Sequence, residues 1–167
     1  YLGGIVLVFA TAGILSGGWY ADWLTSKGRP DATMRTGRIA AVALIPCIVI
    51  APLMPTLTLA LIAFCPLMFF VSVPWAGAAA ALQIVSPPRM RAQISAMYLF
   101  VVNLAGIGFG PVATAFVTDY VFQDDAALPY SLLSVGLVSS VLGLLLLSAG
   151  LAPYRASLAA QDAKAGA

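Results

Sequence analysis

Long apolar runs constrain this chain more than any other feature of its sequence. A helix needs about 20 apolar residues to cross the hydrocarbon core of a bilayer. Five segments approach or exceed that length: 1–21, 39–53, 57–85, 94–121 and 130–151. The runs are continuous rather than alternating, and they are too long for barrel strands. We therefore predict an all-α, polytopic membrane helix bundle with five transmembrane helices over residues 1–152.

Charged residues are too scarce for most soluble functions. Only 8% of the residues are charged and the mean hydropathy is +1.01, whereas about a quarter of the residues in a soluble domain are charged. A net charge of +2 gives no basic surface for nucleic acid. The chain has no His and no Glu, and Cys47 and Cys65 lie inside apolar runs. We predict no enzyme activity, no metal and no cofactor.

The basic residues alternate between the connections that join the apolar runs. Lys and Arg occur in 22–38, in 86–92 and after residue 152, but not in 52–56 or 122–129. The positive-inside rule therefore predicts a multi-pass inner-membrane protein with a cytoplasmic C-terminus. Residues 153–167 form the expected cytoplasmic tail. Its final part, residues 157–167, is small and polar, and we expect it to be disordered.

One cytoplasmic connection begins with GGWYADWLTSKGRPDATMR, residues 17–35. Gly17 and Gly18 carry no side chain, so a neighbouring helix can approach closely. Asp22 at the membrane boundary can accept hydrogen bonds from the N-terminus of another helix or pair with an Arg. Such a contact would hold the cytoplasmic side closed in one state. The alternative is that Asp22 is an ordinary interfacial residue, as we expect for the bases that follow it.

This stretch resembles the G-x-L-A-D-R-x-G-R signature of the major facilitator superfamily of transporters. Gly18, Ala21 and Asp22 match its core, and Gly28 with Arg29 matches the later Gly-Arg pair after three extra residues. Three positions depart from the signature: Tyr20, Trp23 and Pro30. The resemblance makes Gly17, Gly18, Asp22, Gly28 and Arg29 the expected gating motif.

Residues 88–119 are similar to the eleventh helix of spinster-like members of that superfamily. The matching residues are Arg91, Ala92, Gly106, Gly108, Gly110, Pro111 and Asp119. The resemblance implies that the five spans are helices eight to twelve of a twelve-helix transporter and that the chain is a C-terminal fragment. Its expected partners are the lipid bilayer, the N-terminal half of the same protein and a small organic solute or amphiphile moved by alternating access. The alternative function is a membrane-embedded structural or assembly subunit without transport activity.

Polar residues within the spans are candidates for a solute cavity. Asn103 lies near mid-bilayer, and an amide facing lipid costs several kcal/mol, so we expect it to face protein or a water-filled cavity. Substrate contact and interhelical hydrogen bonding both remain open for it. Thr11, Ser72 and Trp75 are further candidates, with core packing favoured for Trp75.

Glycines and prolines within the spans indicate packing faces and hinges. Gly106, Gly108 and Gly110 give the fourth span a small-residue face. Pro74 and Pro111 interrupt the helical hydrogen bonds of the third and fourth spans. We predict helix packing at the glycines and hinges at the prolines.

Overall fold

The computed structural model describes residues 2–29 and 31–165. In that part of the chain it contains helices and turns but no strands, and five helical rods are long and apolar enough to cross a membrane. This confirms the predicted all-α fold and the number of candidate spans.

Each rod is one helix or a series of helical segments. The first rod comprises α1 (Leu2–Ile5), the π-helical η1 (Val6–Ala10) and α2 (Thr11–Ser26). The second comprises α3 (Ala32–Ile50) and the 3₁₀ turn η2 (Ala51–Leu53), and the third is α4 (Leu57–Val85). The fourth rod consists of η3 (Pro88–Met90), α5 (Arg91–Asn103), the π-helical η4 (Leu104–Phe109), α6 (Gly110–Phe116) and the π-helical η5 (Val117–Phe122). The 3₁₀ turn η6 (Asp125–Ala127) then leads into the fifth rod, α7 (Leu128–Ala165).

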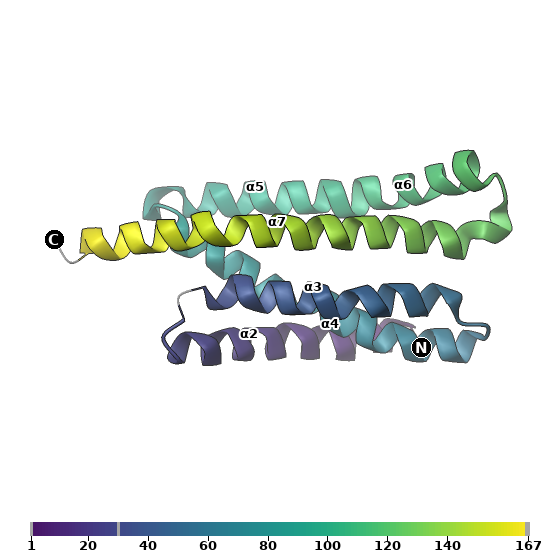
Figure 1. Ribbon diagram of the computed structural model, residues 1–167, viewed down its shortest axis with the longest axis horizontal. Coiled ribbons are helices and arrows are strands. Elements are labelled where there is room, and N and C mark those ends of the chain that lie inside the picture. Colours follow the sequence, from purple (N-terminus) through teal and green to yellow (C-terminus); the bar gives the residue numbers. More distant parts are fainter. Residues whose placement is uncertain (1, 30, 166–167) are drawn as a thin grey trace.

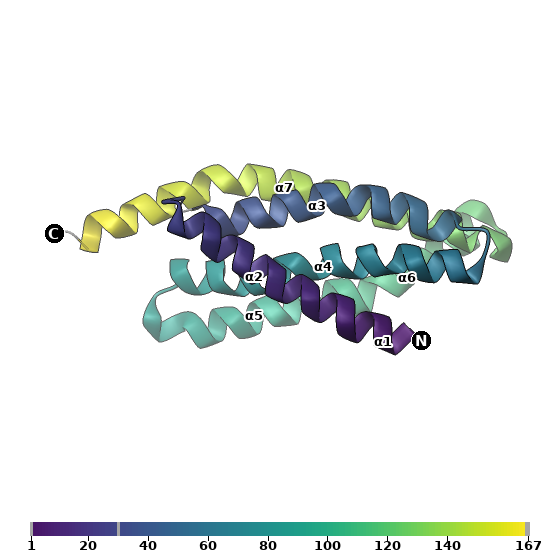
Figure 2. The same ribbon diagram turned by 90° about the horizontal axis from the view of Figure 1, so that it is seen from below.

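Successive rods run in opposite directions along the long axis of the bundle (Figure 1). Helix α3 packs against α4 on one side and α7 on the other, and α2 packs along α4. The rod that contains α5 and α6 touches α4 and α7 more sparingly. Seen from below, α1 and α2 cross the other rods diagonally (Figure 2).

The helices extend further than the sequence predicted. The connection expected at 22–38 is reduced to a short turn, because α2 continues to Ser26 and α3 begins at Ala32. Charge was taken as a sign of a loop, but long basic side chains in a first helical turn can reach water while the backbone stays helical. The prediction of a disordered tail is also wrong over the described residues. Helix α7 continues to Ala165, and the Ala, Leu, Gln and Lys of this tail are strong helix formers.

Small side chains make up most of the buried interior of the bundle. Ala21, Ala32, Ala40 and Ala81 are among the few buried apolar residues. Most large apolar side chains lie on the outside, as Leu57 does with 78% of its surface exposed. Small residues between helices with large apolar residues outside are the arrangement of helices that pack within lipid.

Candidate functional site

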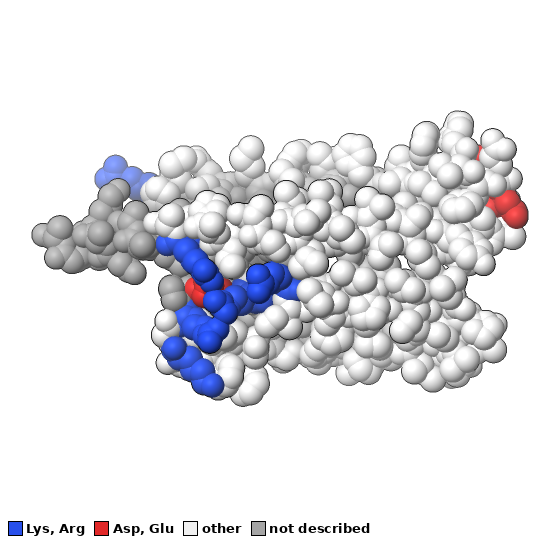
Figure 3. Space-filling model, viewed as in Figure 1, with Lys and Arg blue, Asp and Glu red and all other residues white. Residues whose placement is uncertain are grey.

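The basic residues gather at one end of the bundle (Figure 3). They come from the α2–α3 turn, the start of α3, the α4–α5 connection and the end of α7. The described basic side chains are those of Lys27, Arg29, Arg35, Arg38, Arg89, Arg91 and Arg155. In this view, acidic side chains lie at the opposite end of the molecule, and another acidic side chain lies among the bases. We call the end of the bundle that carries these seven bases the basic end.

Gly28 ends α2 in the left-handed conformation, with φ of +76°. The amide of Gly28 donates to the carbonyl of Thr25 at 2.9 Å, and the amide of Arg29 donates to that of Leu24 at 3.3 Å. This pair of bonds is a Schellman motif, which closes a helix at a residue where a side chain would be strained. The Gly28-Arg29 pair, predicted as part of a gating motif, therefore has a local role in shaping the turn.

Asp31 is the buried carboxylate at the basic end, with 3% of its surface exposed. It directly precedes α3, but its side chain makes no hydrogen bond that caps the helix. Instead, its Oδ2 accepts from Arg35 Nε at 2.7 Å and from Arg155 Nε at 2.9 Å. Arg155 Nη2 donates to the same oxygen. One carboxylate thus links the start of α3 to the end of α7.

The surroundings of Asp31 favour its charged form. Burial removes water and by itself raises the pKa of the carboxyl group, but the hydrogen bonds and positive charges of Arg35 and Arg155 outweigh it. The pKa of Asp31 is therefore held below its ordinary value of 3.8. The ion pair is fully formed at neutral pH.

A second contact joins α3 to α7 beside this ion pair. The hydroxyl groups of Thr33 and Tyr154 lie 3.3 Å apart within hydrogen-bond distance, and Tyr154 is buried. The end of α7 is therefore fixed to the start of α3 by both a charged and a neutral hydrogen bond.

Glycines bring α2 against α4. A Cβ atom built on Gly13 would lie 2.3 Å from the carbonyl oxygen of Phe69, and one on Gly17 would lie 2.2 Å from that of Val73. Both pairs advance by four residues in the same direction, as expected for the first and third rods of an alternating bundle. This confirms the close helix approach predicted at Gly17. Gly18 faces open space in the described part of the chain, so the same prediction is wrong there.

Asp22 stands apart from the Asp31 ion pair. It is exposed on α2, and its carboxylate makes no hydrogen bond or ion pair with the residues that the structure describes. Its position, five residues beyond the glycine that touches α4, leaves it free to meet another segment at the membrane boundary.

The four intramembrane cavity candidates lie in different environments. Asn103 is exposed, and its Nδ2 donates to the carbonyl of Leu99 in its own helix at 2.7 Å. Thr11 is exposed, whereas Ser72 is buried beside Gly13. Trp75 is 49% exposed, so the core packing favoured for it is wrong. The structure does not bring these residues together into one cavity.

The glycine face of the fourth rod has no close neighbour among residues 2–29 and 31–165. Cβ atoms on Gly106 and Gly110 would meet nothing within 4 Å, and one on Gly108 would meet only Leu104 of the same helix. The π-helical segment η4 directly precedes α6, which holds Pro111 in its first turn. This wider turn accommodates a proline that lacks an amide hydrogen. Pro74 lies inside α4, which stays helical through it.

Sequence reasoning missed the residues that are bonded most closely at the basic end. Asp31, Tyr154 and Arg155 were not identified, although Asp31 and Arg35 have the four-residue spacing of a helical ion pair. That signal was in the sequence. The contact to Arg155 was not, because the two residues are 124 positions apart.

Comparisons with protein-family models, with curated proteins and with solved structures find no match to this chain.

Proposed function

We propose that this bundle is the C-terminal part of a secondary active transporter of the major facilitator superfamily. It would move a small organic solute or amphiphile by alternating access between two halves of the protein. The observation that carries the proposal is the combination on α2 of a glycine-mediated contact with α4 and an exposed Asp22 at the basic end. A rigid helix pair that presents an unneutralised carboxylate at the membrane boundary suits a contact made in one conformation and broken in another.

Asp22→Asn is expected to lower solute uptake by the full-length protein in proteoliposomes by about ten- to hundredfold. In the proposed contact with another segment, the Asp22 carboxylate would accept a charge-assisted hydrogen bond of about 1.5–3 kcal/mol, which the variant weakens, and about 1.4 kcal/mol corresponds to a factor of ten in rate. The substrate is first identified by screening solutes for uptake by the unaltered protein.

Asp124→Asn is the matched control, since it removes one carboxylate from the opposite end of the bundle. Equal uptake by Asp22→Asn and this control would mean that Asp22 is an ordinary interfacial residue with no role in transport. Absence of uptake for every solute screened would favour the structural or assembly subunit instead.

The basic end is proposed to face the cytoplasm of a cell with an inner membrane, because positive residues flank spans on that side. Single-cysteine variants test this in a chain carrying Cys47→Ser and Cys65→Ser. A membrane-impermeant maleimide added to intact cells is expected to label Gln123→Cys and to spare Arg29→Cys until the cells are permeabilised. The opposite pattern would invert the topology.

A further inference from the structure

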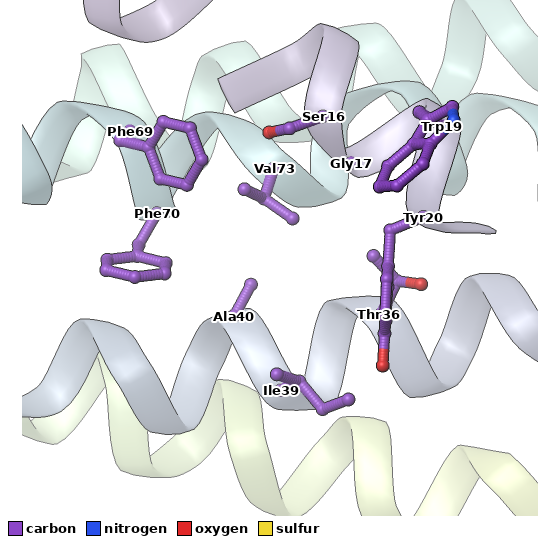
Figure 4. A pocket seen from close by; sticks show the side chains of 10 residues that line it. All are labelled: Ser16, Gly17, Trp19, Tyr20, Thr36, Ile39, Ala40, Phe69, Phe70 and Val73. Atoms are coloured by element: carbon purple, nitrogen blue, oxygen red, sulfur yellow. The ribbon is translucent and has the colours of Figure 1, made fainter. Parts of the chain in front are cut away.

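An apolar groove opens between α2, α3 and α4 near the basic end (Figure 4). It has a volume of about 380 Å³, and its walls include Trp19 and Tyr20 of α2, Ile39 of α3 and Phe69 of α4. Two hydroxyl groups on its walls, those of Ser16 and Thr36, donate to carbonyl groups of their own helices. Ser16 donates to Gly13 at 3.0 Å, for example. The groove therefore favours an apolar occupant and requires no hydrogen bond from it.

The groove follows from how α2 is held. Gly13 and Gly17 fix α2 against α4, while α2 and α3 meet at their short turn and diverge away from it (Figure 2). The two helices therefore converge toward the basic end. Trp19 and Ile39 on the rim of the groove are 70% and 52% exposed, so the groove opens sideways, toward the lipid that surrounds a membrane helix bundle.

Basic side chains lie near the end where α2 and α3 converge. Arg35 and Arg38 precede Ile39 by four residues and by one, on neighbouring positions of α3. Arg35 is paired with Asp31, whereas Arg38 makes no ion pair with the described residues. On α2, Lys27 Nζ lies 3.7 Å from the centre of the Trp23 ring. Lys27 follows Trp19 by eight residues, or about 12 Å along the helix.

We propose that the groove binds an anionic phospholipid of the surrounding bilayer, with one acyl chain between α2 and α3 and its phosphate against Lys27 and Arg38. Residues 22–38 hold four bases and two carboxylates, and Arg155 adds a fifth base through its contact with Asp31. The excess of positive charge fits an anionic headgroup, as in basic pockets between membrane helices. A free phosphate has no acyl chain and would leave the apolar walls of the groove uncovered. The inference does not depend on the transport proposal.

Fluorescence quenching tests the site through Trp19. The full-length protein, with Trp23, Trp75 and every tryptophan outside these 167 residues changed to Phe, is placed in phosphatidylcholine bilayers that contain a known fraction of phosphatidylglycerol. Either the phosphatidylglycerol or an equal amount of the phosphatidylcholine carries brominated acyl chains. Bromine on phosphatidylglycerol is expected to quench Trp19 more strongly than bromine on phosphatidylcholine. The dependence of this excess quenching on the phosphatidylglycerol fraction gives an apparent affinity for the anionic lipid. In Lys27→Gln/Arg38→Gln this affinity is expected to fall by about fivefold for each base removed.

Two further variants separate this site from diffuse attraction. Arg89→Gln/Arg91→Gln removes the same charge from the other connection at the basic end and is expected to keep the excess quenching. Ser16→Leu fills the groove and leaves every base in place, so it is expected to abolish the excess. Equal quenching by the two lipids would overturn the proposal. So would an equal loss in both double variants, or quenching that persists when the groove is filled.

Discussion

Gly17→Ala is expected to destabilise the full-length protein by about 1–3 kcal/mol, the usual effect of forcing extra volume into a packed interface. The added Cβ atom would lie 2.2 Å from the carbonyl oxygen of Val73 and 3.0 Å from its carbonyl carbon. Both are backbone atoms, so no side-chain rotation relieves the clash and α2 has to move away from α4. The midpoint of thermal unfolding in detergent is expected to fall by roughly 2–12 °C.

Gly18→Ala is the matched control, since it makes the same chemical change one residue later, where nothing lies within 4 Å. Alanine favours a helix by about 0.5–1 kcal/mol over glycine, so this variant is expected to be neutral or slightly stabilising. The unfolding midpoint should therefore fall in Gly17→Ala and stay the same or rise slightly in Gly18→Ala. A fall of equal size in both would show that the contact with α4 does not hold α2 in place.

Asp31→Asn is expected to cost about 1–3 kcal/mol of stability. Breaking a fully buried ion pair costs about 3–5 kcal/mol, but the side chains of Arg35 and Arg155 are 32% and 46% exposed and water screens part of the loss. The exposed Asp22→Asn should change stability by no more than about 0.5 kcal/mol. Unfolding midpoints of the two variants provide the comparison, and equal midpoints would contradict the importance of the buried pair.

Arg155→Gln and the double variant Asp31→Asn/Arg155→Gln complete a cycle that isolates the contact between the turn and α7. The double variant is expected to lose less stability than the two single losses combined, because each single change already breaks the pair. Strict additivity would mean that the two residues do not interact.

The same ion pair gives stability a dependence on acidity. The folded-state pKa of Asp31 lies below 3.8, so its contribution is fully present above that value and is lost as pH falls through the lowered pKa. The difference in unfolding midpoint between the unaltered protein and Asp31→Asn should therefore be constant near neutral pH and shrink below about pH 4. A difference that grows on acidification would contradict this assignment.

Apolar length predicted the helical fold, because crossing a bilayer leaves the backbone few alternatives. It did not predict where the helices end. Arg35 and Arg38 belong to α3, and residues 155–165 belong to α7, since beyond the apolar region local helix propensity and side-chain pairing decide the boundary. The charged residues identified the basic end correctly because they lie beyond the apolar region. They misplaced the turn because they also lie within helices.

Single positions at the candidate site were predictable only where one residue determines the geometry. Gly17 was identified because an absent side chain has a direct consequence for packing. Gly18 is also a glycine, but it lies on a different face of the helix from Gly17. The sequence of a glycine pair does not show which of the two contacts a neighbouring helix. Asp31 was overlooked because its importance comes from Arg155, a partner that only the folded chain brings near.

The link between Asp31 and Arg155 also sets an order on biosynthesis. The two residues are separated by 124 positions, and ribosomes add roughly 5–20 residues per second. The carboxylate of Asp31 is therefore made just before Arg35, whereas Arg155 follows only after roughly 6–25 s. Closure of this contact is a late event of membrane insertion, and a chain truncated before Arg155 would never complete it.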